Sequence, residues 1–335
     1  MNTTAPPASA LNHRAPAAAL RRMAFAAALC GLVVVPWISG YATQRLMVEV
    51  FCVATIALAW NLLAGYAGLV VVGHQMFVGV GAYALFSLSN TFNLNPWLAL
   101  PLAAVTSAIF AALSALPLLR LSGPYLAVAT WVLAEVLRIG ALNSPWLGAG
   151  GGLPLEAIRE FDRAARNAGT YWASLAVFAG SLLAASMMLR GRLGLALMSV
   201  RDSEPAAAAA GVHVLRAKFL LWLAAGVMTG LAGSVSYMST LQVTPDASFG
   251  MNWTAVALFI TILGGIGTLE GPLLGTLLYF VLRELFAGYG TWYFIGLGAL
   301  AMFVMLVAPG GMWSLFNRRG FLDVFGIRRR MDTHS

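Results

Sequence analysis

The sequence predicts an all-α polytopic membrane protein with about ten transmembrane helices. Hydrophobic residues make up 60% of the 335 residues and charged residues only 10%, whereas a soluble domain carries about 25% charged residues. Apolar runs of roughly 20 residues, the length that crosses a bilayer, recur along the chain. The net charge of +8 does not indicate nucleic-acid binding, because the basic residues collect at the ends of these runs.

The first half begins with a polar segment, residues 1–20, which we expect to be a disordered cytoplasmic tail and not a secretory signal peptide. Five apolar runs follow, and each is long enough to cross the membrane. We predict these spans at 23–40, 46–64, 69–88, 97–117 and 121–141.

The second half contains five further spans, after which residues 317–335 form a basic cytoplasmic tail. The region from Gly264 to Pro272 holds glycines, a glutamate and a proline, a combination that favours a turn between two spans. The whole transmembrane domain then covers residues 21–316. We predict the later spans at 170–189, 218–239, 251–266, 272–287 and 291–309.

Loop charge supports an even number of spans with both termini cytoplasmic. Basic residues concentrate in cytoplasmic loops, and an odd count would place the basic tail outside. With the N-terminus inside, most of the 20 Lys and Arg residues fall on the cytoplasmic side. These are Arg14, Arg21, Arg22, Arg120, Arg190, Arg192, Arg201, Arg216, Lys218, Arg318, Arg319, Arg328, Arg329 and Arg330.

Residues 192–218 form the longest polar interruption in the second half, and the basic excess of this loop places it in the cytoplasm. Glu204 and Pro205 begin an alanine-rich stretch that ends at Gly211, which predicts a short helix with a glycine stop. A cytoplasmic helix held between two spans is suited to docking a soluble partner.

Glycines and polar residues share the otherwise apolar region from Asn61 to Tyr83. Broken helices in membranes are tolerated only against protein or a water-filled cavity, so Asn61, Gly73, His74 and Gln75 are candidates for a substrate path. The alternative for His74 is a histidine satisfied by a neighbouring helix. The alternative for the glycines is close helix packing, which GxxxG pairs such as Gly226/Gly230 also predict.

Glu135 and Arg138 stand three residues apart in the fifth predicted span, so they share a helix face and can pair. Charged residues within membranes are usually functional, which makes Glu135 a further path candidate.

The sequence contains no constellation that indicates an enzyme. Its only lysine, Lys218, follows an alanine, so no phosphate-binding loop is present. The four histidines lack metal-ligand spacing, and Cys30 and Cys52 lie inside apolar runs, where we interpret them as packing residues. We therefore expect no catalytic residue, no metal and no cofactor in this chain.

Five motifs together resemble the inner-membrane permeases of branched-chain amino-acid ABC importers, the LivM-like type, over about residues 46–315. They are NLLAGYAG at 61–68, GHQMFVGVGAY at 73–83, GPYLAVAT at 123–130, VRDSEPAAAAAGV at 200–212 and GGIGTLEGPLLG at 264–275. The third motif adds Tyr125 to the path candidates.

The resemblance implies a bacterial inner-membrane subunit that works with a second permease subunit, two cytoplasmic ATPases that use the ATP, and a periplasmic substrate-binding protein. The fourth motif matches the coupling loop that contacts the ATPases in such importers. It assigns this role to Arg201, Asp202, Glu204, Ala206, Ala207 and Gly211.

The substrate expected from the resemblance is a branched-chain or other small amino acid, and related permeases carry urea, amides and other small solutes. The chain departs from the family at 69–72, where Leu-Val-Val-Val replaces a stretch that usually contains Gln and Ser. Two other classes are a proton-coupled secondary transporter that uses Glu135 or His74, and a membrane-embedded enzyme. The first does not explain the coupling loop, and the second lacks a catalytic cluster.

Overall fold

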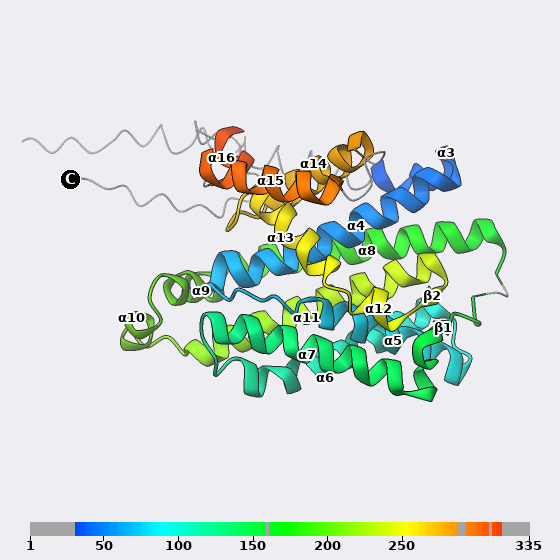
Figure 1. The fold of residues 1–335 in the computed structure, drawn as a ribbon, viewed down its shortest axis with the longest axis horizontal. Coiled ribbons are helices and arrows are strands. Elements are labelled where there is room, and N and C mark those ends of the chain that lie inside the picture. The colour runs from blue at the N-terminus through cyan, green and yellow to red at the C-terminus, as the bar shows by residue number, and fades with distance from the viewer. Residues whose placement is uncertain (1–30, 159–160, 287–291, 308–309, 317–335) are drawn as a thin grey trace, which may run out of the picture.

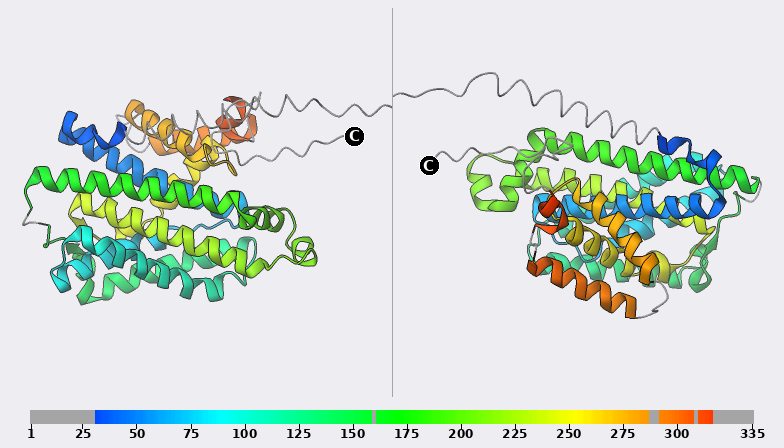
Figure 2. Two further views of the ribbon diagram at one scale, coloured as in Figure 1. Left: turned by 180° about the vertical axis from the view of Figure 1, so that it is seen from behind. Right: turned by 90° about the horizontal axis from the view of Figure 1, so that it is seen from above.

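The computed structural model describes residues 31–158, 161–286, 292–307 and 310–316. They form a helical bundle whose long helices run roughly parallel to the longest axis of the molecule (Figure 1). We call its two ends the α10 end, where α9 and α10 lie, and the strand end, where β1, β2 and α3 lie (Figures 1 and 2). The tails predicted at 1–20 and 317–335 lie outside the described residues, as does the first part, residues 23–30, of the span predicted at 23–40.

The elements follow the predicted order. The first half contains α3 (Val35–Ile38), α4 (Tyr41–Asn61), the π-helical turn η1 (Leu62–Tyr66), α5 (Gln75–Phe92), α6 (Pro96–Leu118), α7 (Pro124–Asn143), η2 (Pro145–Leu147), η3 (Ala149–Gly151) and β1 (Leu153–Pro154). The second half contains α8 (Arg163–Arg190), α9 (Arg192–Asp202), α10 (Glu204–Ala209), α11 (Val214–Thr240), β2 (Gln242–Val243), α12 (Pro245–Ser248), α13 (Asn252–Gly264), α14 (Gly271–Phe286), α15 (Trp292–Val307) and α16 (Gly311–Phe316).

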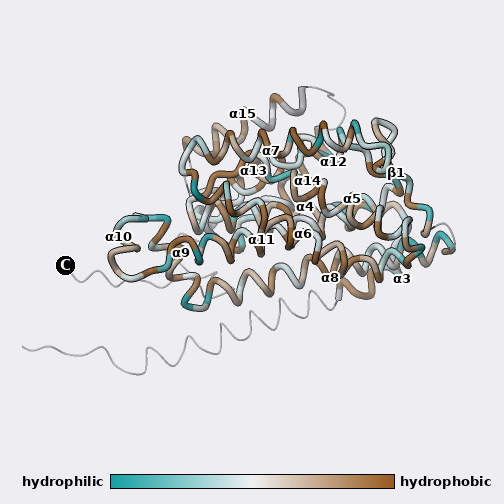
Figure 3. The backbone as a smooth tube through the Cα atoms, turned by 90° about the horizontal axis from the view of Figure 1, so that it is seen from below, coloured by the Kyte–Doolittle hydropathy of each residue, from teal (hydrophilic) through white to brown (hydrophobic). Residues whose placement is uncertain are grey.

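The all-α prediction is confirmed, apart from the antiparallel pair of two-residue strands β1 and β2. Within the part of the chain that the structure describes, six helical segments are long and apolar enough to cross a membrane: 41–66, 96–118, 124–143, 163–190, 214–240 and 245–264. The helices α5, α14 and α15 are shorter. Hydrophobic colour predominates along the bundle, and hydrophilic residues gather mostly near its two ends (Figure 3). The fold is therefore that of a multi-pass membrane protein.

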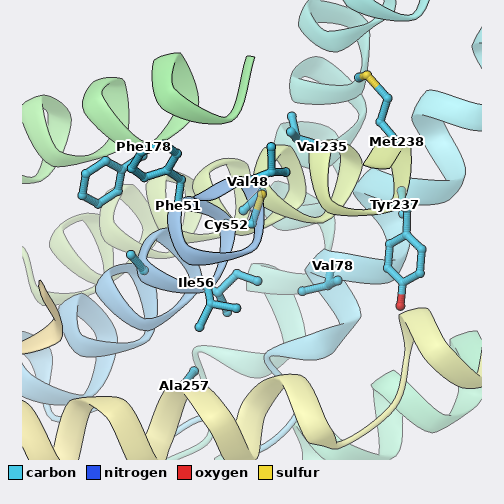
Figure 4. Close-up of a cluster of buried hydrophobic side chains, with 14 of the residues drawn as sticks. Val48, Phe51, Cys52, Ile56, Val78, Phe178, Val235, Tyr237, Met238 and Ala257 are labelled. Carbon is cyan, nitrogen blue, oxygen red and sulfur yellow. The ribbon is translucent and has the colours of Figure 1, made fainter. Parts of the chain in front are cut away.

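The helix α11 lies at the centre of the bundle and packs against α4, α5, α6 and α8. A Cβ atom placed on Gly230 would lie 2.2 Å from the Ser107 hydroxyl, and one placed on Gly81 would lie 2.0 Å from the Gly230 carbonyl oxygen. The close helix packing predicted from Gly226/Gly230 is thus confirmed. Val48, Ile56, Val78 and Val235 fill the core beside this contact (Figure 4).

The predicted turn between the eighth and ninth spans is confirmed, because α13 ends at Gly264 and α14 begins at Gly271. Two boundaries were wrong. The third span does not begin at 69, because residues 68–74 are unwound and α5 begins at Gln75. The sixth span, predicted from 170, begins at Arg163, where Asp162 caps the helix by accepting a hydrogen bond from the Ala164 N–H.

Candidate functional site

The unwound segment, residues 68–74, connects η1 at the α10 end to α5 within the bundle (Figure 1). Leu69 and Val71 are buried, whereas Val70 between them is 49% exposed. The Trp60 indole donates to the Val71 carbonyl oxygen at 2.8 Å and so fixes the buried side. The main-chain groups of Val70 and Val72 make no hydrogen bond to the residues that the structure describes. One side of this segment is therefore anchored, and the other is open.

The end of the unwound segment is held by three threonines from other helices. The Gly73 N–H donates to the Thr130 hydroxyl of α7 at 3.2 Å, and the Gln75 N–H donates to the Thr254 hydroxyl of α13 at 3.1 Å. His74 is fully buried, and its Nε2 atom lies 2.7 Å from the Thr229 hydroxyl of α11. The expectation that a neighbouring helix satisfies this histidine holds for one ring nitrogen, while Nδ1 has no partner among the described residues.

Gly73 lies directly against the backbone of α7. A Cβ atom placed on this glycine would lie 1.8 Å from the Thr130 carbonyl oxygen. No side chain fits in that space unless α7 moves. The packing alternative considered for Gly73 therefore has a direct structural basis.

The helix α7 presents a large exposed face beside the unwound segment. Tyr125 is 76% exposed, and Val128, Val132 and Ile139 follow it at helical spacing on the same face. The Glu135 side chain is 43% exposed and accepts a hydrogen bond from Arg138 at 2.6 Å, which confirms the predicted pair. The Arg138 guanidinium also contacts Asp246 of α12 at 2.5 Å. Glu135 is therefore a neutralised group on an exposed helix face and not a buried charge.

Asn61, at the end of α4, is fully buried and joins the first half of the chain to the turn at 265–270. Its amide nitrogen donates to the Thr268 carbonyl oxygen at 2.7 Å, and its side-chain oxygen accepts from the Gly267 N–H at 2.8 Å. Both ends of the amide are used within the chain. In the described residues Asn61 acts as a clamp between α4 and the turn before α14.

Arg201, near the end of α9, reaches the same junction from the coupling loop. Its Nη1 atom donates to the Gly65 carbonyl oxygen in η1 at 2.9 Å, and its guanidinium also pairs with Asp202. The aliphatic part of Arg201 lies beside Gly68, whose φ of +69° begins the unwound segment. A candidate coupling residue therefore contacts η1 and the start of the unwound segment directly.

The helix α10 forms as the alanine-rich stretch predicts. The Ser203 hydroxyl accepts from the Ala206 N–H at its start. At its end the Val212 N–H bonds to the Ala207 carbonyl oxygen and the Gly211 N–H to that of Ala208, with Gly211 at φ +85°. This pattern is a Schellman motif, and it confirms Gly211 as the helix stop. Ala207 is buried, whereas Ala206 is exposed on the outer side of the helix.

Glu204 has a partner that the sequence reasoning missed. Its carboxylate accepts a hydrogen bond from the Lys218 ammonium at 2.6 Å. The Lys218 side chain is only 6% exposed and that of Glu204 is 51% exposed. The pair joins the start of α10 to the second turn of α11.

Replacing Gly211 with valine is expected to disturb the end of α10. Valine is strained at a positive φ, and the penalty is about 1–2 kcal/mol. No atom within 4 Å would meet the new Cβ, so the effect is conformational and not steric. We expect reduced protection of the Val212 amide in hydrogen exchange. Gly211→Asn, which tolerates this conformation better, is the control, and equal protection in all three proteins would contradict the assignment.

The sequence indicates some residues of the site but not the contacts that they make. Thr130, Thr229 and Thr254 are polar residues inside apolar spans, which is the available signal, but nothing in the sequence pairs them with Gly73, His74 and Gln75. The partners of Arg201 and Lys218 leave no local pattern. Among the described residues, no group of three or more His, Cys, Asp or Glu side chains is arranged to hold a metal ion.

Comparison with known proteins gives one consistent result. Residues 42–308 match the family described as the permease component of the branched-chain amino acid transport system. The chain is 29% identical to the high-affinity branched-chain amino acid transport system permease protein LivM of Salmonella typhimurium and to that of Escherichia coli. Each match extends over 283 residues, 77% of this chain and 66% of the relative.

A probable branched-chain amino acid transport permease protein LivM of Methanocaldococcus jannaschii is 23% identical over 307 residues, 77% of this chain and 89% of that protein. The chain thus spans just under two thirds of the length of the two bacterial relatives. No solved structure matches the chain significantly.

Proposed function

We propose that this chain, which belongs to the family of permease components of the branched-chain amino acid transport system, is the membrane subunit of an ATP-driven importer. It forms part of the translocation path for branched-chain or other small amino acids. The observation that carries this proposal is the contact between Arg201 and Gly65, because it connects the coupling loop to η1, the turn that leads into the unwound segment. The chain itself binds no cofactor, and partner ATPases use the ATP.

The open side of the unwound segment supports the location of the path. The main chain of Val70 and Val72 has no hydrogen-bond partner among the described residues, and such groups are tolerated at membrane depth only against protein or water. The exposed face of α7 lies beside it. We infer that a second permease subunit covers this region, and that the path runs between the two subunits along Val70 and Tyr125, whereas Gly73 and His74 are buried within this subunit.

The coupling step uses the exposed surface of α10 and the contact between Arg201 and Gly65. The exposed side of α10, which includes Ala206, is free to dock on a cytoplasmic ATPase. When ATP binding moves the ATPases, α10 and α9 shift together, and Arg201 transmits the shift to Gly65 and the unwound segment. Movement at the α10 end thereby changes which side of the membrane the path opens to. A periplasmic binding protein delivers the substrate at the strand end.

The proposal also implies an orientation of the chain in the membrane. Among the described residues, α4 begins at the strand end. The spans that follow alternate in direction along the bundle, and α15 ends near α16 at the α10 end (Figures 1 and 2). With Arg120, Arg190 and Arg216 at the α10 end, the positive-inside rule makes that end cytoplasmic. A first span at 23–40 brings the total to ten and places both termini in the cytoplasm of a bacterial inner membrane. The transmembrane permease domain is then 21–316, with 192–218 as its coupling loop.

Cysteine labelling tests this topology. Cys30 and Cys52 are the only native cysteines, and both are first replaced by serine. In intact cells, a membrane-impermeant maleimide should label an Asn167→Cys variant, at the start of α8, but not a Ser335→Cys variant. Permeabilising the inner membrane should expose Ser335→Cys. Labelling of Ser335→Cys in intact cells would contradict the ten-span arrangement.

Uptake measurements test the function. Vesicles that contain the complete complex should accumulate radiolabelled leucine when ATP and the binding protein are present, and should not do so with a proton gradient alone. Accumulation driven by the gradient without ATP would favour the secondary transporter instead. Uptake of urea or an amide in preference to leucine would keep the permease function and change the substrate class.

The position of the path predicts different outcomes for two matched valines. Val70 on the unwound segment is 49% exposed, and Val105 on α6 is 54% exposed. Val70→Trp should reduce uptake to the background of empty vesicles, because the ring would fill the space beside the open backbone. Val105→Trp, on the outer surface of α6, should transport like the wild type. Equal uptake by both variants, normalised to assembled complex, would place the path elsewhere.

A further inference from the structure

A groove lies between the C-terminal end of α6 and the corner where α10 leads into α11. Its volume is about 690 Å³, which is large enough for a lipid headgroup and the first part of its chains. Arg120, just after α6, and Arg216, on the first turn of α11, both line it. Ala208 of α10 forms another part of the wall. The groove is therefore in direct contact with the coupling helix.

The basic side of the groove is not neutralised within the described part of the chain. Arg120 and Arg216 are exposed, and neither makes an ion pair or a side-chain hydrogen bond with a described residue. The lining also includes His213, and none of its described lining residues is acidic. Two unpaired guanidinium groups at one groove favour an anionic ligand, because arginine binds phosphate through a rigid set of donors.

The remaining wall of the groove is apolar. Leu119 and Phe219 contribute to it, together with Leu116 and Leu215, which are both strongly exposed. Leu116 is also the last member of an apolar stripe that runs along the outer face of α6. The members of the stripe are Leu98, Leu102, Val105, Ile109, Leu113 and Leu116. A long apolar surface thus leads directly to a basic rim.

We propose that this groove binds an anionic phospholipid of the cytoplasmic leaflet. The phosphate pairs with Arg120 and Arg216, and the acyl chains lie against Leu116 and Leu113, the end of the stripe that is nearest to the groove. A soluble anion such as free phosphate would use only the basic rim, whereas a lipid matches both the charge and the apolar wall. The proposal uses the orientation argued above but does not depend on the transported substrate.

Occupation of the groove has a consequence for coupling. Because Ala208 is part of the wall, a bound lipid packs against α10 on its membrane side. The lipid then contacts the corner between α10 and α11 from the membrane side, while the exposed alanines of α10 stay available to the ATPase. The charge of the surrounding membrane would in this way influence how firmly the coupling helix is held.

The test measures lipid binding to the purified full-length chain in neutral detergent micelles. The probes are phosphatidylglycerol and phosphatidylcholine with identical acyl chains, detected by native mass spectrometry. We expect preferential retention of phosphatidylglycerol. Arg120→Gln or Arg216→Gln should each weaken it about fivefold, and the double variant roughly thirtyfold, as expected for the loss of one or two basic residues near a membrane surface. The control is Arg192→Gln, which removes the same charge at the same end of the bundle but outside the groove.

Three results would overturn the proposal. Equal retention of the two lipids by the wild type would remove the charge preference. Equal losses in Arg216→Gln and Arg192→Gln would indicate general surface charge instead of a site. If Arg120→Gln and Arg216→Gln leave lipid binding unchanged but weaken the association of the ATPase with this chain, the groove is a protein docking surface. If the arginine variants fail to fold, Ala208→Trp provides the test, because it fills the groove without removing charge and should also displace phosphatidylglycerol.

Discussion

Replacing Gly73 with alanine should destabilise the protein and abolish uptake, although it adds only one methyl group. The new Cβ would lie 1.8 Å from the Thr130 carbonyl oxygen and 2.1 Å from its carbonyl carbon, so α7 must move away from the unwound segment. Overpacking of this kind costs about 1–3 kcal/mol and sometimes more, and here the contact is with backbone. Gly73→Leu should prevent assembly altogether.

The measurements are the thermal stability of the purified chain and leucine uptake per assembled complex. Gly140→Ala is the matched control, because Gly140 lies on α7 and a Cβ placed there meets nothing within 4 Å. It should behave like the wild type. If Gly73→Ala keeps wild-type stability and loses only uptake, α7 yields easily and Gly73 serves the path directly, not packing.

The sequence could predict most of the helices for a simple reason. In a membrane each span must satisfy its own backbone, so composition and run length carry the information locally. The turn at 265–270 was found in this way, because Gly264 and Pro272 disfavour a continuous helix and the charge of Glu270 disfavours a continuous span. Gly211 could likewise be recognised as a helix stop, since a glycine after an alanine run has one common structural meaning.

The glycines and polar residues around Gly73 and His74 indicated a broken helix there, and the structure confirms the break. The unwinding of Leu69–Val72 could not be predicted, because this stretch is as apolar as any span. Its conformation depends on long-range contacts, such as the bond from Trp60 to Val71 and the approach of Gly73 to Thr130. The same reason applies to Asn61. As a polar residue in an apolar run it was assigned to the path, but its two hydrogen bonds go to a turn more than 200 positions later in the sequence.

Arg201 shows how far local reasoning reaches at the candidate site. Its place in a basic cytoplasmic loop predicts contact with water or a soluble partner. In the structure the guanidinium points instead to Gly65, at the base of the unwound segment. The composition of the loop identified Arg201 as a candidate, and only the fold shows its contact with η1.

Glu204→Lys should abolish transport, and the structure indicates that the primary cause lies within the chain. Lys218 would lose its partner and face a second positive charge while remaining almost fully buried. Removing one member of a buried pair costs about 3–5 kcal/mol, and the half-exposed position of Glu204 reduces this to roughly 1–3 kcal/mol. The start of α10 should therefore separate from α11, and the thermal stability of the isolated chain should fall.

Two further variants separate this internal role from docking to the ATPase. The charge swap Glu204→Lys with Lys218→Glu should recover much of the lost stability, because it restores an opposite pair at the same place. Ala206→Lys adds the same charge on the exposed side of α10 and should leave stability unchanged while uncoupling ATP hydrolysis from uptake. If Glu204→Lys does not alter stability but Ala206→Lys does, the assignments of the two positions must be exchanged. If the swap restores both stability and uptake, the carboxylate of Glu204 acts through Lys218 alone, and the alanine face of α10 carries the contact with the ATPase.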